Sequence, residues 1–126
     1  MRILIAEDNV TMASALKYIL HHMGYQHISE ANDGGEALRL LSKNQFDLVI
    51  IDWSLPSVSG VAITRWMRLK NTYRETPIIM VTTKDQPEDV LIAVESGVNE
   101  YVLKPLDKDI LKAKIQKVMA KRNLAA

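Results

Sequence analysis

Near the middle of the chain, residues 46–56 read Phe-Asp-Leu-Val-Ile-Ile-Asp-Trp-Ser-Leu-Pro. The part from Leu48 to Ile51 is apolar without interruption, and Asp52 follows it directly. A short run without apolar/polar alternation is typical of a strand that is buried on both faces, as in a parallel sheet. Asp52 would then lie at the carboxyl end of this strand, at the edge of an open α/β sheet where ligands bind. A function for Asp52 therefore depends on the side chains that other strands bring to the same edge.

Four further segments have the composition of strands, and helical patterns lie between them. The five predicted strands are Arg2–Ala6, Gln26–Ala31, Asp47–Asp52, Pro77–Thr82 and Glu100–Leu103. A first helix is predicted because Met12, Leu16, Ile19, Leu20 and Met23 recur at the spacing of one helical face, and Gly24 is expected to end it. A second helix is predicted over Glu36–Lys43, with Asn44 closing it in a left-handed conformation.

The remaining helices are marked by the residues at their ends. Gly60 opens a third helix, Pro87 belongs in the first turn of a fourth that ends at Gly97, and Asp107 or Asp109 starts a fifth. The inward face of the fifth helix is predicted to carry Ile110, Leu111, Ile115, Val118 and Met119. Five alternating βα units with buried strands predict an α/β fold, a single doubly wound (βα)5 domain with a parallel sheet and helices on both faces. A chain of 126 residues fits one domain, with expected bounds 1–126.

The composition excludes several classes of protein. The chain has no cysteine, which excludes disulfides and thiolate metal sites. We expect a cytoplasmic protein with no membrane partner, because no apolar run approaches the length of a membrane span and the first strand is no signal peptide. The net charge of +1 gives no reason to expect direct binding to nucleic acid. Residues 104–122 carry seven basic and two acidic side chains, which favours a solvated helix face or, alternatively, a surface for a partner.

Acidic side chains also follow the first predicted strand. Glu7 and Asp8 come directly after it, so they would meet Asp52 at one edge of the sheet if the first and third strands are neighbours. Three carboxylates so close together repel one another and raise one pKa unless a cation is present. Magnesium removes this repulsion, because it binds carboxylate oxygens, phosphoryl oxygens and water. The fourth and fifth strands add hydroxyls and an ammonium to the same edge, from Thr82-Thr83 and Lys104-Pro105.

Taken in order, these residues resemble a known family. The matching positions are Glu7-Asp8, Asp52 with Pro56 and Gly60 behind it, Thr82, and the run Tyr101-Val102-Leu103-Lys104-Pro105. Over the whole chain, the sequence resembles the CheY-like receiver domain of two-component response regulators. The resemblance implies a flavodoxin-like sheet with strand order 2-1-3-4-5. It also implies that the protein is no enzyme in the usual sense and catalyses only its own phosphorylation and dephosphorylation.

The resemblance assigns roles around the acidic residues. Asp52 would be the phosphoacceptor, a carboxylate nucleophile that forms an acyl phosphate. Asp8 would bind magnesium directly, Glu7 would bind it mainly through water, and the backbone carbonyl of Ser54 would be a further ligand beside Asp52. The metal and Lys104 would neutralise the charge of the phosphoryl group during transfer.

The resemblance also implies a switch. Thr82 would hydrogen-bond the phosphoryl group, and the aromatic ring of Tyr101 would turn inward into the space that Thr82 leaves. The surface of the fourth helix, fifth strand and fifth helix would then change for a downstream protein. Residues expected to modulate the site or the lifetime of the acyl phosphate are Trp53, Ser54, Thr83 and Lys84. In particular, we expect the Lys84 side chain near the phosphoryl group.

Other conspicuous residues have simpler expectations. The Lys104–Pro105 peptide is expected to be cis by the resemblance, and Trp53 to be half-exposed beside the metal. Trp66 lies at helical spacing, which favours a role in packing. Three histidines, His21, His22 and His27, show no metal-binding spacing and are not expected to be ligands.

The expected partners are a histidine kinase or phosphotransfer protein as phosphodonor, read near Thr11–Ala15, and a downstream protein target. The chain would be a monomer or a weak phosphorylation-dependent dimer. Its length and Trp53 favour a stand-alone chemotaxis-type regulator; the alternative is a receiver domain from a longer regulator with a DNA-binding or enzymatic output. A small-molecule phosphohydrolase would need a second acid beside Asp52, and Ser54 offers none. A nucleotide or flavin site would need a glycine loop where Glu7-Asp8-Asn9-Val10 stands.

Overall fold

The computed structural model describes residues 1–125, so Ala126, the last residue of the predicted domain, lies outside the described residues. Its centre is a sheet of five parallel strands in the order β2-β1-β3-β4-β5. The strands are β1 (Arg2–Ala6), β2 (His27–Ala31), β3 (Leu48–Ile51), β4 (Ile78–Thr82) and β5 (Glu100–Leu103). The predicted order is confirmed, and no strand end differs from its predicted position by more than one residue.

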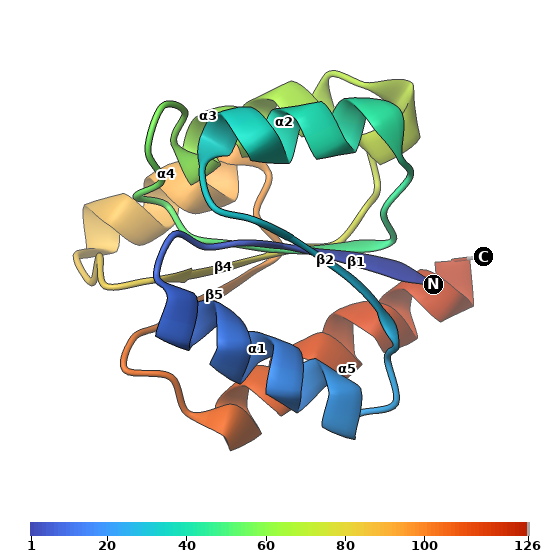
Figure 1. Cartoon of the computed structure of the whole chain (residues 1–126). Coiled ribbons are helices and arrows are strands. Elements are labelled where there is room, and N and C mark those ends of the chain that lie inside the picture. Colours follow the sequence, from blue (N-terminus) through green and yellow to red (C-terminus); the bar gives the residue numbers. More distant parts are fainter. Residues whose placement is uncertain (126) are drawn as a thin grey trace.

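Within the described residues, five α-helices and one short 3-10 helix connect the strands. They are α1 (Val10–His22), α2 (Gly34–Lys43), α3 (Gly60–Arg68), η1 (Asn71–Tyr73), α4 (Pro87–Ser96) and α5 (Lys108–Ala125). Helices α1 and α5 cover one face of the sheet, and α2, α3 and α4 cover the other (Figure 1). This is the predicted doubly wound α/β fold. Among residues 1–125, no helix combines the length and the apolar character that crossing a membrane requires.

The sheet is buried on both faces, as the unbroken apolar strands predict. All four residues of β3 are buried. Their side chains alternate between two cores, so that Ile50 packs with residues of α1 and α5 while Val49 packs with residues of α2, α3 and α4. The same alternation places Ile3 and Leu4 of β1 in opposite cores. Both faces of the central strands are therefore occupied by packing, and the ends of the strands remain for chemistry.

The register brings the carboxyl ends of the strands to one edge. Ala6 of β1 pairs with Ile51 of β3, and each is the last residue of its strand. Thr82 of β4 pairs with Leu103 of β5 in the same way. The residues that follow these pairs therefore leave the sheet side by side, and they include Glu7, Asp52 and Lys104.

Two local predictions are wrong. Asn44 is extended, with φ −128°, and not left-handed; its backbone and side-chain N–H groups both donate to the Leu40 carbonyl, so the end of α2 is satisfied without a left-handed residue. Ile110 is 51% exposed. The buried face of α5 begins instead at Leu111, and Ile110 lies about 100° around the helix from that position.

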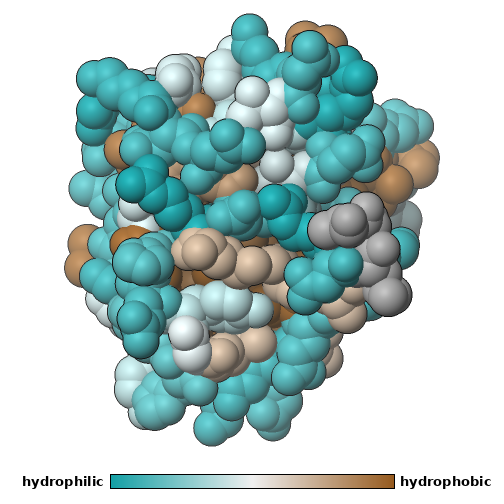
Figure 2. All heavy atoms as spheres, turned by 90° about the vertical axis from the view of Figure 1, so that its right-hand side faces the viewer, coloured by the Kyte–Doolittle hydropathy of each residue, from teal (hydrophilic) through white to brown (hydrophobic). Residues whose placement is uncertain are grey.

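The end of the molecule where the strands begin and where the last described residues of α5 lie (Figure 1) has a different surface. Figure 2 shows that it is mostly hydrophilic, with apolar atoms recessed between hydrophilic side chains. A groove of about 610 Å³ at this end runs between the starts of β4 and β5 and the last turns of α5. Hydrophilic side chains and this groove therefore mark the edge of the sheet where the strands begin (Figure 2).

Candidate functional site

Three carboxylates converge where β1 and β3 end. Glu7, Asp8 and Asp52 each offer an oxygen atom, and these oxygen atoms lie within 4.8 Å of one another. Glu7 and Asp52 are buried, whereas Asp8 is exposed. Gly60 helps to hold this edge together: its N–H donates to the Trp53 carbonyl, and a Cβ atom at this position would lie 2.1 Å from the Asp52 carbonyl oxygen. The chain after Asp52 can fold back this closely because residue 60 is glycine.

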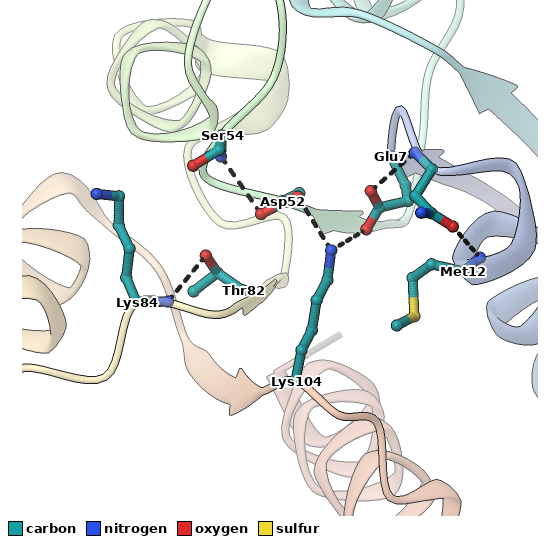
Figure 3. A network of polar contacts seen from close by, with 8 residues as sticks. Glu7, Met12, Asp52, Ser54, Thr82, Lys84 and Lys104 are labelled. Atoms are coloured by element: carbon teal, nitrogen blue, oxygen red, sulfur yellow. Dashed lines mark hydrogen bonds and ion pairs between the residues drawn. The ribbon is translucent and has the colours of Figure 1, made fainter.

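Lys104 lies between two of the carboxylates. Its Nζ is 2.7 Å from Glu7 Oε1 and donates a 3.1 Å hydrogen bond to Asp52 Oδ2, and Figure 3 shows the side chain reaching from the end of β5 towards both residues. The Lys104 N–H donates to the Thr82 carbonyl, which fixes the lysine backbone against β4. The Lys104–Pro105 peptide is cis, as predicted. This position of Lys104 is consistent with the prediction that it reaches the acidic cluster from across the sheet.

The charges of this cluster are not balanced. Burial raises the pKa of the Glu7 carboxyl, and the negative charge of Asp52 adds to this, although Lys104 and the Asn9 N–H act in the opposite direction. Burial also disfavours the charged form of Lys104, but its contacts with Glu7 and Asp52 outweigh burial and raise the pKa of the ammonium. One ammonium thus pairs with two of the three carboxylates, Glu7 and Asp52, and carboxylates outnumber the ammonium.

The donor atoms fit a hard divalent cation. Oxygen atoms of three carboxylates converge there, and two of these carboxylates, Glu7 and Asp52, are buried and share the Lys104 ammonium. Magnesium prefers such oxygen ligands and commonly uses one or two carboxylates together with water. Glu7, Asp8 and Asp52 are therefore suited to hold magnesium. Ser54 donates its N–H to Asp52 Oδ1 at 3.3 Å, and the role of its carbonyl as a ligand stays a prediction.

Asn9 is a residue of this site that the sequence did not single out. Its N–H donates to Glu7 Oε2 at 3.1 Å, and its side-chain oxygen accepts from the Met12 N–H to cap α1. An asparagine just before an amphipathic helix is a common N-cap, so the capping role had a sequence signal. Its contact with Glu7 had none. Asn9 therefore ties the start of α1 to the buried glutamate.

The Lys84 backbone, just after β4, connects Thr82 to Tyr101. Thr82 is buried, and its Oγ1 lies 3.4 Å from the Lys84 N–H, at the long end of the hydrogen-bond range. Thr83 is exposed. The Tyr101 hydroxyl donates a 2.8 Å hydrogen bond to the Lys84 carbonyl. Burial, together with the charges of nearby carboxylates, raises the pKa of Tyr101 to about 12, so the hydroxyl keeps its proton at neutral pH.

The Lys84 side chain contacts Trp53. Lys84 Nζ lies 5.1 Å from the centroid of the Trp53 ring, within the range of a cation–π contact. Trp53 is half-buried, in agreement with the prediction. The two residues follow the ends of the neighbouring strands β3 and β4, and strand adjacency is the signal that could have revealed this pair.

The other aromatic and histidine expectations concern residues outside this site. Trp66 is partly buried against the core, as predicted. The histidines belong to no candidate metal cluster within residues 1–125, where Glu7, Asp8 and Asp52 form the one group that qualifies.

A doubly wound parallel sheet with acidic residues, a threonine and a lysine at its carboxyl edge defines a CheY-like receiver domain. In agreement, the family model described as "Response regulator receiver domain" matches residues 3–116. The chain belongs to the response regulator receiver domain family. It is 35% identical to the chemotaxis protein CheY of Pseudomonas aeruginosa, over 98% of this chain and 99% of that protein. It is 36% identical to the chemotaxis protein CheY1 of Helicobacter pylori strain J99, over 94% and 97% of the two chains.

Solved structures agree with this assignment. A CheY-like response regulator receiver domain protein from Methanospirillum hungatei is 26% identical, with a TM-score of 0.90 over 99% of this chain and 98% of that one. The receiver domain of the sensor histidine kinase PA1611 from Pseudomonas aeruginosa, solved with a magnesium ion coordinated in its active-site cleft, is 28% identical. Its TM-score is 0.85 over 94% of this chain and 97% of that one. Receiver domains of this kind are signalling proteins and not metabolic enzymes.

Proposed function

We propose that this chain is a phosphorylation-activated response regulator in which Asp52 accepts a phosphoryl group from a histidine kinase or a histidine phosphotransfer protein. The observation that carries the proposal is the position of Asp52, buried at the end of β3 beside Glu7 and Asp8 and hydrogen-bonded to Lys104. In the transfer, the P–N bond of the phosphohistidine breaks and a P–O bond to an Asp52 carboxylate oxygen forms.

The surrounding residues neutralise and orient the reacting groups. Lys104 already lies 3.1 Å from Asp52 Oδ2, so its ammonium can pair with a phosphoryl oxygen attached there. The Ser54 N–H orients the other carboxylate oxygen, Oδ1. Glu7, Asp8, Asp52 and the Ser54 carbonyl would hold magnesium. When bound, magnesium would supply positive charge to the phosphoryl oxygens.

The switch begins at Thr82. Its hydroxyl accepts a long contact from the Lys84 N–H, at 3.4 Å, so it can leave that contact and hydrogen-bond the phosphoryl group. The Lys84 carbonyl in turn accepts from the Tyr101 hydroxyl, which connects this loop to β5. A change at Asp52 is thereby passed to the surface of α4, β5 and α5.

That surface has the character of a protein-binding site. Leu91 and Val94 of α4 and Leu103 of β5 are exposed apolar side chains. The basic side chains of α5 follow them in the chain. Exposed apolar residues together with like charges are suited to a protein partner that carries apolar and acidic side chains. We assign this surface to the downstream target.

The phosphodonor would approach from the other side of the site. A groove of about 670 Å³ lies beside Lys104 and Thr83 and is lined by Thr11, Met12 and Ala15 of α1 and by Leu106. This position includes the segment Thr11–Ala15, where the sequence predicts the contact with the kinase. A donor seated there would have its phosphohistidine next to Asp52.

Two settings are compatible with this function. Similarity to chemotaxis proteins over nearly their full length favours a stand-alone chemotaxis-type regulator. Similarity to the receiver domain of a signal transduction histidine kinase from Syntrophus aciditrophicus, with 34% identity and a TM-score of 0.86, favours a receiver domain within a longer regulator. A partner that binds only the phosphorylated form supports the first setting, and transfer of the phosphoryl group onward to a histidine supports the second.

Sedimentation with and without beryllofluoride separates a monomer from a weak phosphorylation-dependent dimer.

The central test is acyl-phosphate formation. With acetyl phosphate and magnesium, the intact protein should gain the mass of one phosphoryl group, and EDTA should prevent the gain. Asp52→Asn should abolish it, whereas Asp85→Asn, an exposed acid near the same edge, should not. Magnesium should also quench Trp53 fluorescence. Phosphorylation that persists in Asp52→Asn would show that another residue is the acceptor.

A further inference from the structure

Lys84 contacts three functional parts of the molecule at once. Its ammonium lies over the Trp53 ring, its N–H faces Thr82 Oγ1 at 3.4 Å, and its carbonyl accepts the Tyr101 hydroxyl at 2.8 Å. These partners are the neighbour of the phosphoacceptor, the threonine of the switch and the aromatic residue of the switch. A movement of Lys84 would therefore change its contacts with Trp53, Thr82 and Tyr101 together.

The Lys84 ammonium is held more weakly than that of Lys104. Lys104 forms ion pairs with two buried carboxylates, whereas Lys84 forms no salt bridge within the part of the chain that the structure describes. A cation–π contact at a partly exposed site contributes little, and Lys84 and Trp53 are both half-buried. Figure 3 shows Lys84 and Lys104 on either side of Thr82 and Asp52. One lysine is thus fixed in the acidic cluster, and the other is free to exchange partners.

We propose that the Lys84 ammonium rests on Trp53 in the unmodified protein and moves to bind the phosphoryl group when Asp52 is phosphorylated. The inference rests on the proposed function. The phosphoryl group carries about 1.5–2 negative charges, which replace the single charge of the Asp52 carboxylate, and it offers three strong acceptor oxygens. A charge-assisted hydrogen bond to such an oxygen is stronger than a solvent-exposed cation–π contact. The new charge therefore outcompetes the indole ring for the ammonium.

The transfer has a consequence for the switch. The same residue supplies the carbonyl that anchors the Tyr101 hydroxyl and the N–H that faces Thr82. When the ammonium leaves Trp53 and the Thr82 hydroxyl leaves the Lys84 N–H, two of the three contacts of Lys84 change together. The position of the Tyr101 acceptor then depends on the state of Asp52. In the unmodified protein, the contact between the Lys84 ammonium and the Trp53 ring holds the loop after β4 in place.

The first test observes the cation directly by NMR. In the unmodified protein, the ε-methylene protons of Lys84 should be shifted upfield by the ring current of Trp53. Saturation with magnesium and beryllofluoride should remove this shift. The matched control is Lys70, whose Nζ lies 5.2 Å from the Trp66 centroid and whose shift should not change. A ring-current shift at Lys84 that survives saturation overturns the proposal, as does its absence in the unmodified protein.

The second test is a double-mutant cycle on beryllofluoride affinity. Trp53→Leu should raise the affinity, because the ammonium loses its resting place, and Lys84→Met should lower it. Each change should be roughly two- to five-fold, the equilibrium equivalent of a cation–π contact at a partly exposed site. In the Lys84→Met background, Trp53→Leu should have no further effect. Additive effects would show that the two residues act independently. Lys70→Met serves as the control and should leave the affinity unchanged.

The two proposals fail in different ways. If the wild-type protein binds no beryllofluoride and forms no acyl phosphate, the proposed function fails and the role of Lys84 falls with it. If the wild-type protein is phosphorylated at Asp52 but Lys84 keeps its ring-current shift, only the transfer of the ammonium is wrong. Lys84→Arg keeps the cation and should behave like the wild type in the affinity measurement.

Discussion

Two glutamates at opposite edges of the sheet each lie next to a lysine, yet their pKa values move in opposite directions. Glu7 Oε1 is 2.7 Å from Lys104 Nζ, and burial nevertheless raises the pKa of this carboxyl. Glu100 Oε1 is 2.9 Å from Lys114 Nζ. Burial alone would raise the pKa of Glu100 as well, but Lys114 and Lys117 outweigh it and lower the pKa. The distance to the nearest lysine does not explain the difference.

The difference has two causes: the Glu7 side chain is buried more deeply, with 2% exposure against 13% for Glu100, and the lysines are shared differently. Lys104 is the ammonium for Glu7 and Asp52 together, whereas Glu100 has two lysines of its own. At the amino edge of the sheet the charges are therefore compensated, and at the carboxyl edge they are not. Uncompensated buried charge destabilises a fold unless a ligand or metal supplies the missing charge. The carboxyl edge is organised for a ligand, and the amino edge is organised for stability.

Hydrogen bonds at the amino edge support this contrast. The Arg68 guanidinium donates to the Tyr73, Arg74, Thr76 and Gly97 carbonyls and to the Asn99 side chain, at 2.7–3.2 Å. This one side chain joins the end of α3 to the starts of β4 and β5. At the carboxyl edge, Lys104 and Asn9 hold Glu7 at 2.7 and 3.1 Å, but the Ser54–Asp52 and Lys84–Thr82 contacts are 3.3 and 3.4 Å long. Arg68 therefore anchors the amino edge more firmly than these two backbone N–H contacts hold Asp52 and Thr82.

Removal of Arg68 should produce the largest loss of stability. Arg68→Met should lower the free energy of unfolding by about 3 kcal/mol, because several partly buried carbonyls lose a charged donor. Burial lowers the pKa of the guanidinium, but arginine remains charged at neutral pH. Urea denaturation measures the effect. Beryllofluoride affinity at the opposite edge should stay close to that of the wild type.

The control for this experiment lies on the same helix. Arg65 is exposed, and Arg65→Met should change the free energy of unfolding by less than about 0.5 kcal/mol. Equal losses in the two variants would mean that any positive charge on α3 is sufficient. The anchoring role of Arg68 would then have to be abandoned.

Removal of a second tertiary hydrogen bond at the amino edge, from the Tyr73 hydroxyl, should cause a smaller loss of stability. The Tyr73 hydroxyl donates to the carbonyls of Leu41 and Asn44, which ties η1 to the end of α2. Tyr73→Phe should lower the free energy of unfolding by about 1–2 kcal/mol, since it leaves buried carbonyl groups without a donor. Thermal or urea unfolding would measure this, with the exposed Tyr18→Phe as the matched control. A neutral Tyr73→Phe would show that the ring, and not the hydroxyl, is what this position needs.

At the carboxyl edge, removal of a negative charge should increase the stability of the fold. Asp52→Asn should raise the free energy of unfolding by about 1 kcal/mol in EDTA, because it relieves repulsion while Lys104 keeps its ion pair with Glu7. Saturating magnesium should reduce or reverse this advantage, since the wild type gains more from the cation. Asp85→Asn, outside the cluster, should be nearly neutral. A destabilised Asp52→Asn in EDTA would show that the carboxylate is structurally needed.

The contrast between the edges also explains which features the sequence could predict. The sheet and the acidic site follow from local patterns: an apolar run ends at Ile51, and Asp52 comes next. The tertiary hydrogen bonds of Arg68 and Tyr73 at the amino edge correspond to no such pattern in the sequence. Arg68 looks like a surface residue of an amphipathic helix, and most of its partners are backbone carbonyls, which any residue supplies. The contact between Lys84 and Trp53 likewise depends on the spacing of two strands. The sequence predicted Lys84 near the phosphoryl group, and the structure adds its position on the indole ring.

The smallest expected effect concerns the compensated glutamate, Glu100. A carboxyl with a lowered pKa stabilises the fold above its unfolded pKa of 4.5, and this contribution is lost as the pH falls through the lower, folded value. Lys114→Met should therefore lower the free energy of unfolding by about 0.5 kcal/mol at neutral pH, a value limited by solvent exposure of the lysine. The difference from the wild type should close as the pH drops below 4.5, because protonated Glu100 no longer attracts the lysine. Urea titrations at several pH values, with the exposed Lys121→Met as control, would measure it. A difference that stays constant down to low pH would mean that the lysine stem packs on the sheet and that the charges at the amino edge contribute little.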